Sequence, residues 1–223
     1  MKVTVDAAVF SYVNESLNVL LIKRKFQPFL GKYALAGGFV NDDESADAAV
    51  LRKLKEETNV KLDYLEQLYT FTSPKRDPRE RVISITYYGL IDPRKHDLIT
   101  NVHASAIAWF SYADVMKMDL AFDHKEILKY AHTRLANKVK YEPIGFELLP
   151  KEFTMTDIYK LYSVLADHEL DRRNFSKKIL KTGLLIEGDK KEKTVGAGRK
   201  ATLYSFDEKK YKELKKNGFN FDI

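Results

Sequence analysis

Residues 38–60 read GFVNDDESADAAVLRKLKEETNV, and this stretch has the pattern of one helix between two loops. Apolar residues recur at helical spacing across residues 45–58, at Ala48, Ala49, Leu51 and Leu54. Residues 41–43 offer side chains that can cap the helix, with acids that favour its dipole. Asn59 follows the helix, at a place where a left-handed residue is common and Asn is the usual alternative to Gly.

The stretch resembles the Nudix box, whose pattern is G-x5-E-x7-R-E-U-x-E-E-x-G-U, with U an aliphatic residue. Seven pattern positions match: Gly38, Glu44, Arg52, Leu54, Glu56, Glu57 and Val60. Two positions depart, because Lys53 replaces a glutamate and Asn59 replaces the second glycine. The resemblance implies a loop, helix and loop whose glutamates hold Mg²⁺ or Mn²⁺ beside the pyrophosphate of a nucleoside diphosphate derivative.

Lys53 changes the chemistry that this resemblance implies. On a helix, positions 53, 56 and 57 are spaced i, i+3 and i+4, so their side chains face one patch. Three carboxylates there would bind a hard divalent cation, which would neutralise phosphates and activate water. With Lys53, the patch has a formal charge of −1 rather than −3. Unit charges about 4 Å apart interact by about 4 kcal/mol at an effective dielectric of about 20, so we expect metal affinity to fall by orders of magnitude.

We expect Lys53 to pair with Glu56 or Glu57, the alternative being that it points to solvent. Arg52 is spaced for a structural pair with Glu56. No catalytic residues are expected in this degenerate box, at Glu44, Arg52, Lys53, Glu56 and Glu57. Glu80, outside the box, is a candidate base that could rescue weak hydrolysis. Glu56 and Glu57 would hold Mg²⁺ only if such activity remains, and no cofactor is otherwise required.

The sequence around the box predicts a mixed sheet. Strands are expected at 3–12 and 18–25, with a turn at 14–16, and further strands at 33–40, 65–71, 81–90 and 106–111. A second helix is expected over 126–140. Strands with helices on either side suit an α/β class fold, the Nudix α/β/α sandwich. Pro143, Gly145 and Pro150 interrupt regular structure, so we divide the chain into a Nudix-like ligand-sensing domain, 1–142, and a second domain, 143–223.

The second domain has the outline of a small winged helix-turn-helix. Thr154 or Thr156 can cap a helix that runs through Ala166. Asp171 can cap a second helix that ends at Gly183, and two strands then flank a charged loop. Residues 171–200 hold 10 basic and 4 acidic residues, whereas the whole chain has a net charge of +6. This local excess indicates a polyanionic partner.

The start of the second helix is the candidate for reading double-stranded DNA in the major groove. The predicted DNA-contacting residues of that helix are Arg172, Arg173, Asn174, Lys177 and Lys178. Phe175 and Ile179 are expected to pack inward. The predicted wing contributes Lys190, Lys191, Lys193, Arg199 and Lys200, placed for phosphates or the minor groove. The alternative for the wing lysines is a solvated hairpin.

Segments beyond the box widen the resemblance to the Nudix-related transcriptional regulators, the NrtR family. These segments are KRKFQPFLGKYALAGGFV, SPKRDPRERVISITYYGLI and EPIGFELLPKEFTMTDIYKLY…RRNFSKK…GRKATLY. The resemblance implies a homodimer that binds palindromic operators and senses a small-molecule effector. That effector would be ADP-ribose or a related NAD metabolite, or a pentose such as L-arabinose. Some members of the family have a degraded Nudix box and only sense a ligand, and the replacement of a box glutamate by Lys53 resembles that group.

Ligand contacts are expected from a strand that leads to the box and from the 73–80 loop. The candidates are Lys23, Arg24, Gly37, Gly38, Arg76, Asp77, Arg79, Glu80 and Arg81. The alternative for the loop is a solvated group of charges paired with one another. Asp123 and His124 are further candidates at the pocket edge, although a lone surface histidine is the commoner explanation.

Composition narrows the class of protein. The chain has no cysteine, which excludes disulfides and thiolate metal sites. It has no apolar run of about 18 residues and no signal-peptide pattern. We therefore expect no membrane span and a cytoplasmic location. The leading hypothesis is a DNA-binding transcriptional regulator. The alternatives are an active Nudix hydrolase of ADP-ribose or a related nucleoside diphosphate derivative, and a ligand-binding adaptor without DNA contact.

Overall fold

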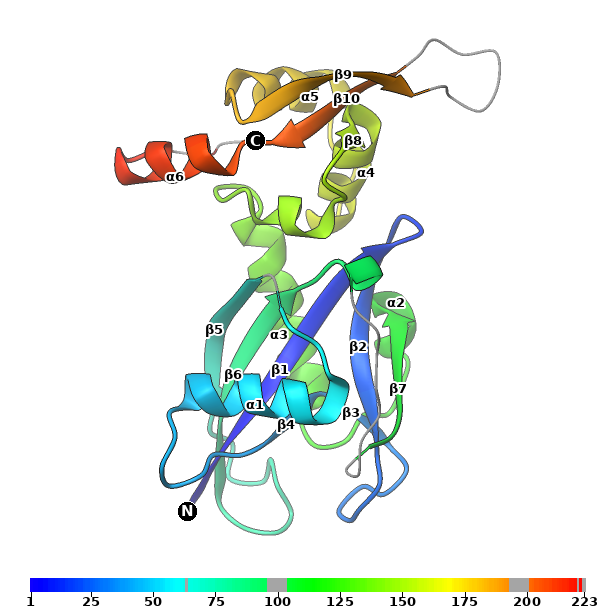
Figure 1. Cartoon of the computed structure of the whole chain (residues 1–223). Coiled ribbons are helices and arrows are strands. Elements are labelled where there is room, and N and C mark those ends of the chain that lie inside the picture. The colour runs from blue at the N-terminus through cyan, green and yellow to red at the C-terminus, as the bar shows by residue number, and fades with distance from the viewer. Residues whose placement is uncertain (63, 96–103, 193–200, 220, 222–223) are drawn as a thin grey trace. The chain divides into compact units, whose positions relative to one another are not determined.

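The computed structural model describes the chain except residues 63, 96–103, 193–200, 220 and 222–223 (Figure 1). Two compact units make up the chain, Met1–Arg134 and Leu135–Ile223. The division falls inside helix α3 (His124–Lys138), ahead of the predicted boundary between residues 142 and 143.

The first unit contains a mixed seven-stranded sheet. Its strands are β1 (Lys2–Val13), β2 (Ser16–Arg24), β3 (Tyr33–Ala34), β4 (Ala36–Phe39), β5 (Tyr64–Phe71), β6 (Val82–Leu90) and β7 (Ala104–Ser111). The main path runs β3-β2-β1-β6-β5, while β4 pairs with β1 and β7 pairs with β2. Only the β1–β6 pair is parallel within this described sheet. Helix α1 (Ala46–Thr58) lies in front of the sheet in Figure 1 and α3 lies behind it, so the predicted sandwich is confirmed.

Strand β1 lies at the centre of the sheet, between β2 and β6, and its residues 4–11 are all buried. Val5, Ala7 and Val9 are fully buried, and they pack with residues of β2, α1 and β6 in one core cluster. The hairpin between β1 and β2 turns at Asn14 and Glu15, which have φ of 50° and 58°. This confirms the predicted turn. Short segments η1 (Pro93–Lys95) and α2 (Tyr112–Val115) complete the unit.

Helix α1 follows the sequence pattern with two differences. Ser45 caps the helix by accepting a hydrogen bond from Ala48 N, so the prediction of a cap at 41–43 was wrong. Leu51 is 54% exposed and Ala48 is exposed as well, whereas Val50 faces the core. Asn59 is left-handed at φ 57°, and its N–H bonds to Lys55 O, which confirms the predicted end of the helix.

The second unit joins three helices to a small sheet. It comprises η2 (Ile144–Leu148), β8 (Phe153–Thr154), α4 (Met155–Leu165), α5 (Arg172–Lys181), β9 (Leu185–Glu192), β10 (Ala201–Phe206) and α6 (Glu208–Lys216). The strand order is β8-β10-β9. Thr154 caps α4 in a capping box with Asp157, and Asp171 caps α5, as predicted. Helix α6 was not predicted, because its nine residues are mostly charged and none is buried.

Candidate functional site

A cavity of about 240 Å³ lies in the first unit, where β1, β2, β4, α1 and the 72–81 loop converge. Its lining is mostly polar and charged. The lining residues are Thr4, Asp6, Ile22, Arg24, Leu35, Gly37, Gly38, Phe39, Asn41, Lys53, Glu57, Arg76, Asp77, Arg79, Phe122 and His124.

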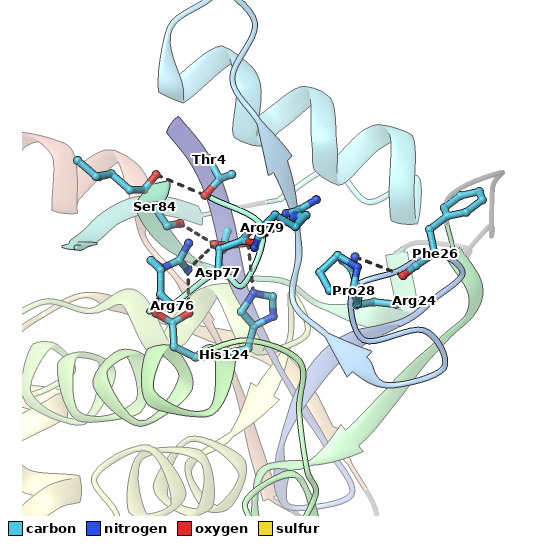
Figure 2. A network of polar contacts seen from close by, with 12 residues as sticks. Thr4, Arg24, Phe26, Pro28, Arg76, Asp77, Arg79, Ser84 and His124 are labelled. Atoms are coloured by element: carbon cyan, nitrogen blue, oxygen red, sulfur yellow. Dashed lines mark hydrogen bonds and ion pairs between the residues drawn. The ribbon is translucent and has the colours of Figure 1, made fainter. Parts of the chain in front are cut away.

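Buried ion pairs around Arg76 form one wall of the cavity (Figure 2). The Arg76 guanidinium donates to both oxygens of Asp123, at 2.9 and 2.8 Å, and to Asp6 Oδ2 at 3.3 Å. Ser84 also donates to Asp6, and His124 Nε2 lies 3.5 Å from its other oxygen. Burial raises the pKa of Asp6, but His124, Arg76 and Ser84 outweigh that effect and lower it to about 2. Asp6 is therefore ionised at neutral pH.

Two arginines and two aromatic rings form a second group in the cavity lining. Asp77 accepts from Arg79 Nε at 3.0 Å and from Arg79 Nη2 at 2.7 Å, which fixes the Arg79 side chain. The Arg79 guanidinium lies 5.2 Å from the ring centre of Phe39 and 5.7 Å from that of Phe122. Arg24 lies 4.8 Å from the Phe122 ring centre and donates to Pro28 O at 2.8 Å. Burial and the nearby Arg79 lower the pKa of Arg24.

The box residues on α1 are joined to one another. Arg52 donates to Glu44 at 2.9 Å and to both oxygens of Glu56 at 3.2 Å, which confirms the predicted Arg52–Glu56 pair. Lys53 Nζ lies 2.9 Å from Glu56 Oε2. This confirms the predicted pairing of Lys53, and the solvent-facing alternative was wrong, because only 19% of its side chain is exposed.

Glu57 is the box carboxylate that enters the cavity. Its Oε2 accepts a hydrogen bond from Gly37 N at 2.9 Å, and the residue is buried. Burial raises the pKa of Glu57 to about 7, although Gly37 N–H and the Lys53 charge act to lower it. At neutral pH this carboxyl is therefore partly protonated.

The divalent ion that a Nudix box implies does not fit these residues. Glu44 and Glu56 are held by Arg52 and Lys53, and Glu57 is partly protonated. In the described part of the chain, no group of three or more His, Asp or Glu side chains could hold a metal. A hard cation prefers several ionised oxygen ligands, and this patch offers it an ammonium instead.

Most of the predicted ligand residues meet at the cavity. Those in the lining are Arg24, Gly37, Gly38, Arg76, Asp77 and Arg79, together with the pocket-edge candidate His124. Lys23 and Arg81 lie outside the lining, and Arg81 donates instead to Thr72 O. Glu80 lines a neighbouring depression with Asn41 and Asp42. Roles for these three in ligand binding remain predictions.

Sequence reasoning missed Asp6, Phe39 and Phe122. Asp6 had a signal, since it is the single charged residue in the apolar run 3–12. A charge in a buried strand requires a partner, so its position alone indicated a site. Phe39 and Phe122 gave no such signal in the sequence, because a lone aromatic residue is usual in any core.

Helix α5 carries the second set of predicted contacts. Phe175 and Ile179 are buried, as predicted, and Arg173, Asn174, Lys177 and Lys178 are exposed. Arg172 is also exposed, but its guanidinium donates to Thr156 Oγ1 at 2.8 Å and lies over the Tyr159 ring. Of the predicted wing residues, Lys193, Arg199 and Lys200 lie outside the described residues. Lys190 and Lys191 fall in β9, and their side chains are likewise not described.

Two family models match separate parts of the chain. A model of the NUDIX domain matches residues 2–131, and a model of the NrtR DNA-binding winged helix domain matches residues 145–206. The chain belongs to the NrtR family. Its relative from Acinetobacter baylyi, the ADPR responsive transcriptional repressor NtrR, is 34% identical over 91% of this chain and 81% of that protein.

Solved structures of the NrtR family give the same result. NrtR of Shewanella oneidensis complexed with a 27mer DNA has a TM-score of 0.79 at 34% identity, over 92% of this chain and 93% of that one. The NUDIX domain of the same protein complexed with ADP ribose has a TM-score of 0.57 at 40% identity. That match covers 60% of this chain and 88% of that one. The described helices of this NrtR family member include none long and apolar enough to cross a membrane.

Proposed function

We propose that this chain is a transcriptional repressor that binds operator DNA and responds to ADP-ribose. The observation that carries the proposal is the coexistence, in one chain, of a cationic Nudix pocket that lacks a metal-ligand cluster among its described residues and an exposed basic helix α5. The relatives from Acinetobacter and Shewanella support both halves, since their names state ADPR response and DNA complexes.

The pocket favours an anionic ligand over a neutral sugar. Arg24, Lys53, Arg76 and Arg79 all line a cavity of about 240 Å³. Arginine suits bidentate phosphate contact, so a diphosphate such as that of ADP-ribose matches this lining. A pentose such as L-arabinose would bury these charges against hydroxyl groups alone. We therefore place ADP-ribose or a related NAD metabolite ahead of L-arabinose.

Helix α5 would read the DNA through Arg173 and Asn174, with Lys177 and the wing on phosphates. We propose that a homodimer in the cytoplasm places two such helices on a palindromic operator. ADP-ribose would weaken DNA binding only by having different affinities for the DNA-bound and free forms.

The test is fluorescence anisotropy on a labelled palindromic duplex, obtained by selecting bound sequences from a random pool. We expect specific binding that weakens with rising salt, because phosphate contacts release counterions. Adding ADP-ribose should release the duplex, whereas L-arabinose at the same concentration should not. An unchanged affinity with ADP-ribose, or no specific duplex at all, would contradict the proposal.

The rival function is hydrolysis of ADP-ribose, and a magnesium-dependent turnover assay separates it from sensing. We expect no turnover, because the described residues offer no metal cluster. Activity comparable with that of ordinary Nudix enzymes would overturn the argument from Lys53. Loss of operator binding in Arg173→Ala would argue against an adaptor without DNA contact, whereas retained binding would mean that DNA is not read through Arg173.

A further inference from the structure

The end of the Lys53 side chain lies beside Gly38 at the cavity lining. A Cβ atom added at Gly38 would lie 2.7 Å from Lys53 Cε and 3.4 Å from Nζ. The end of the lysine side chain therefore occupies the space beside Gly38 that a side chain at position 38 would fill. Lys53 and Gly38 both line the cavity, so the absence of a side chain at position 38 leaves room for the ammonium there.

When every carboxyl group is counted as ionised, the residue at position 53 sets the sign of the formal charge of the lining. The lining contains four cationic side chains, Arg24, Lys53, Arg76 and Arg79, against three carboxylates, Asp6, Glu57 and Asp77. With the box glutamate at position 53, the same lining would contain three cations against four carboxylates. An excess of carboxylates repels a phosphate unless a bound cation offsets it, whereas an excess of cationic side chains attracts a phosphate directly.

The ammonium also retains donors for a ligand. In the described part of the chain its hydrogen bond goes to Glu56 Oε2 at 2.9 Å. A lysine ammonium has three donors, so two N–H groups remain. Glu56 itself does not line the cavity, so it anchors the ammonium from one side and leaves the cavity side available.

We propose that the Lys53 ammonium contacts the diphosphate of the ligand in place of a divalent metal ion. Ligand binding is then independent of metal. This inference rests on the proposed function, in that the ligand is ADP-ribose. Arg24 and Arg79 would contact the remaining phosphate oxygens, while Arg76 stays engaged with Asp6 and Asp123. Lys53 thus both removes the hydrolytic metal and supplies the positive charge that the metal would have provided.

The test is calorimetric titration of the full chain with ADP-ribose, once in EDTA and once in MgCl₂. For the wild type we expect dissociation constants that agree within about twofold in the two buffers. Lys53→Met keeps the length of the side chain and removes its charge, so it should weaken binding by about tenfold or more in both buffers. Lys53→Glu should weaken binding by about a hundredfold or more in EDTA and recover part of it in MgCl₂.

The matched control is Lys55→Glu, which makes the same charge change on the exposed side of the same helix. We expect its affinity to stay within about twofold of the wild type, because solvent screens that charge. Thermal melting and circular dichroism of each variant separate lost ligand contact from lost folding. Wild-type binding that requires MgCl₂, or folded Lys53→Met that binds as tightly as the wild type, would overturn the proposal.

Failure of the proposed function has a different signature. If the wild-type chain binds ADP-ribose in EDTA but binds no operator duplex, the proposed repressor function is refuted and the proposed role of Lys53 is supported. Wild-type chain that binds the duplex but neither ADP-ribose nor inorganic pyrophosphate in EDTA would refute the role of Lys53 and leave DNA binding standing.

Discussion

Basic side chains gather in two regions of this molecule, the Nudix pocket and helix α5, and the two regions hold them differently. In the pocket, Arg76 has 3% of its side chain exposed and contacts two carboxylates. On α5, Arg173 and Lys177 are exposed, and no ion pair or hydrogen bond joins their side chains to another described residue. The pocket orders its charges before any ligand arrives, whereas α5 keeps them hydrated.

This difference suits two kinds of anion. A small ligand loses most of its hydration on entering a cavity, so fixed donors reduce the cost of ordering side chains around it. DNA is a long polyanion whose bound counterions are released by any approaching cation, so mobile hydrated side chains suffice.

Removing the buried cation should be the most costly change. In Arg76→Met, Asp6 and Asp123 lose the guanidinium that both contact, so we expect a loss of about 3–5 kcal/mol in the free energy of unfolding. The matched control is Lys32→Met, which breaks an exposed pair with Asp119 and should cost far less, because solvent screens both charges. Urea unfolding measures both, and equal losses would remove the contrast between buried and exposed pairs.

Glu57 should make stability depend on pH. Its pKa in the folded chain is about 7, above the ordinary 4.5, so the folded state binds more protons between these values. The free energy of unfolding should therefore fall by about 3 kcal/mol as pH rises from about 4.5 to about 7.

Glu57→Gln should lack this particular slope, because the amide still accepts from Gly37 N but does not titrate. The other charges that act on Glu57, from Lys53, Asp6 and Arg24, are kept in the variant. Chemical denaturation of both proteins across this pH range gives the difference. Parallel curves would show that Glu57 has an ordinary pKa.

On α5, a single substitution should affect DNA alone. Arg173→Ala should weaken operator binding by about 1–3 kcal/mol, as expected for a base contact, and leave the melting temperature nearly unchanged. Lys129→Ala removes an equal charge from an exposed site on α3 and should have little effect. Anisotropy titrations at one salt concentration compare the three proteins, and equal affinities would argue against α5 as the reading helix.

The smallest effect is expected at Arg81, which was predicted from the sequence to contact the ligand but does not line the cavity. Arg81→Ala should leave ADP-ribose binding within about twofold, because its guanidinium reaches Thr72 O instead. Arg79→Ala should weaken binding about tenfold, since Arg79 lines the cavity. Calorimetry with the same ligand tests the pair, and a reversed order would mean that the 72–81 loop rearranges around the ligand.

Most of the fold could be predicted from local patterns in the sequence. Helical spacing predicted α1 and a pair between Lys53 and either Glu56 or Glu57, because residues three or four apart on a helix are neighbours; the observed pair is with Glu56. The end of α1 at Asn59 and the cap of α4 at Thr154 were equally local and were confirmed. By contrast, Leu51 fitted the apolar pattern and is exposed, since periodicity alone does not define the edge of the buried face.

The cavity was harder to predict because its contacts are distant in sequence. Arg76 and Asp6 are separated by 70 residues, and Arg76 and Asp123 by 47. The charged loop predicted that Arg76 would matter, but only the pairing of strands in the folded sheet brings its partners together. Lys23 and Arg24 illustrate the same limit: neighbouring strand residues point to opposite faces, and the sequence did not show which one faces the cavity.

The end of the Lys53 side chain beside Gly38 couples these two positions. A Cβ atom added at position 38 would lie 2.7 Å from Lys53 Cε, so in Gly38→Ala the flexible end of the lysine would have to move. Such a movement costs little stability, but it would shift the ammonium at the cavity lining that both residues share. Gly38→Ala should therefore change where the pocket holds this charge, and in a Lys53→Ala background there is no charge for it to move.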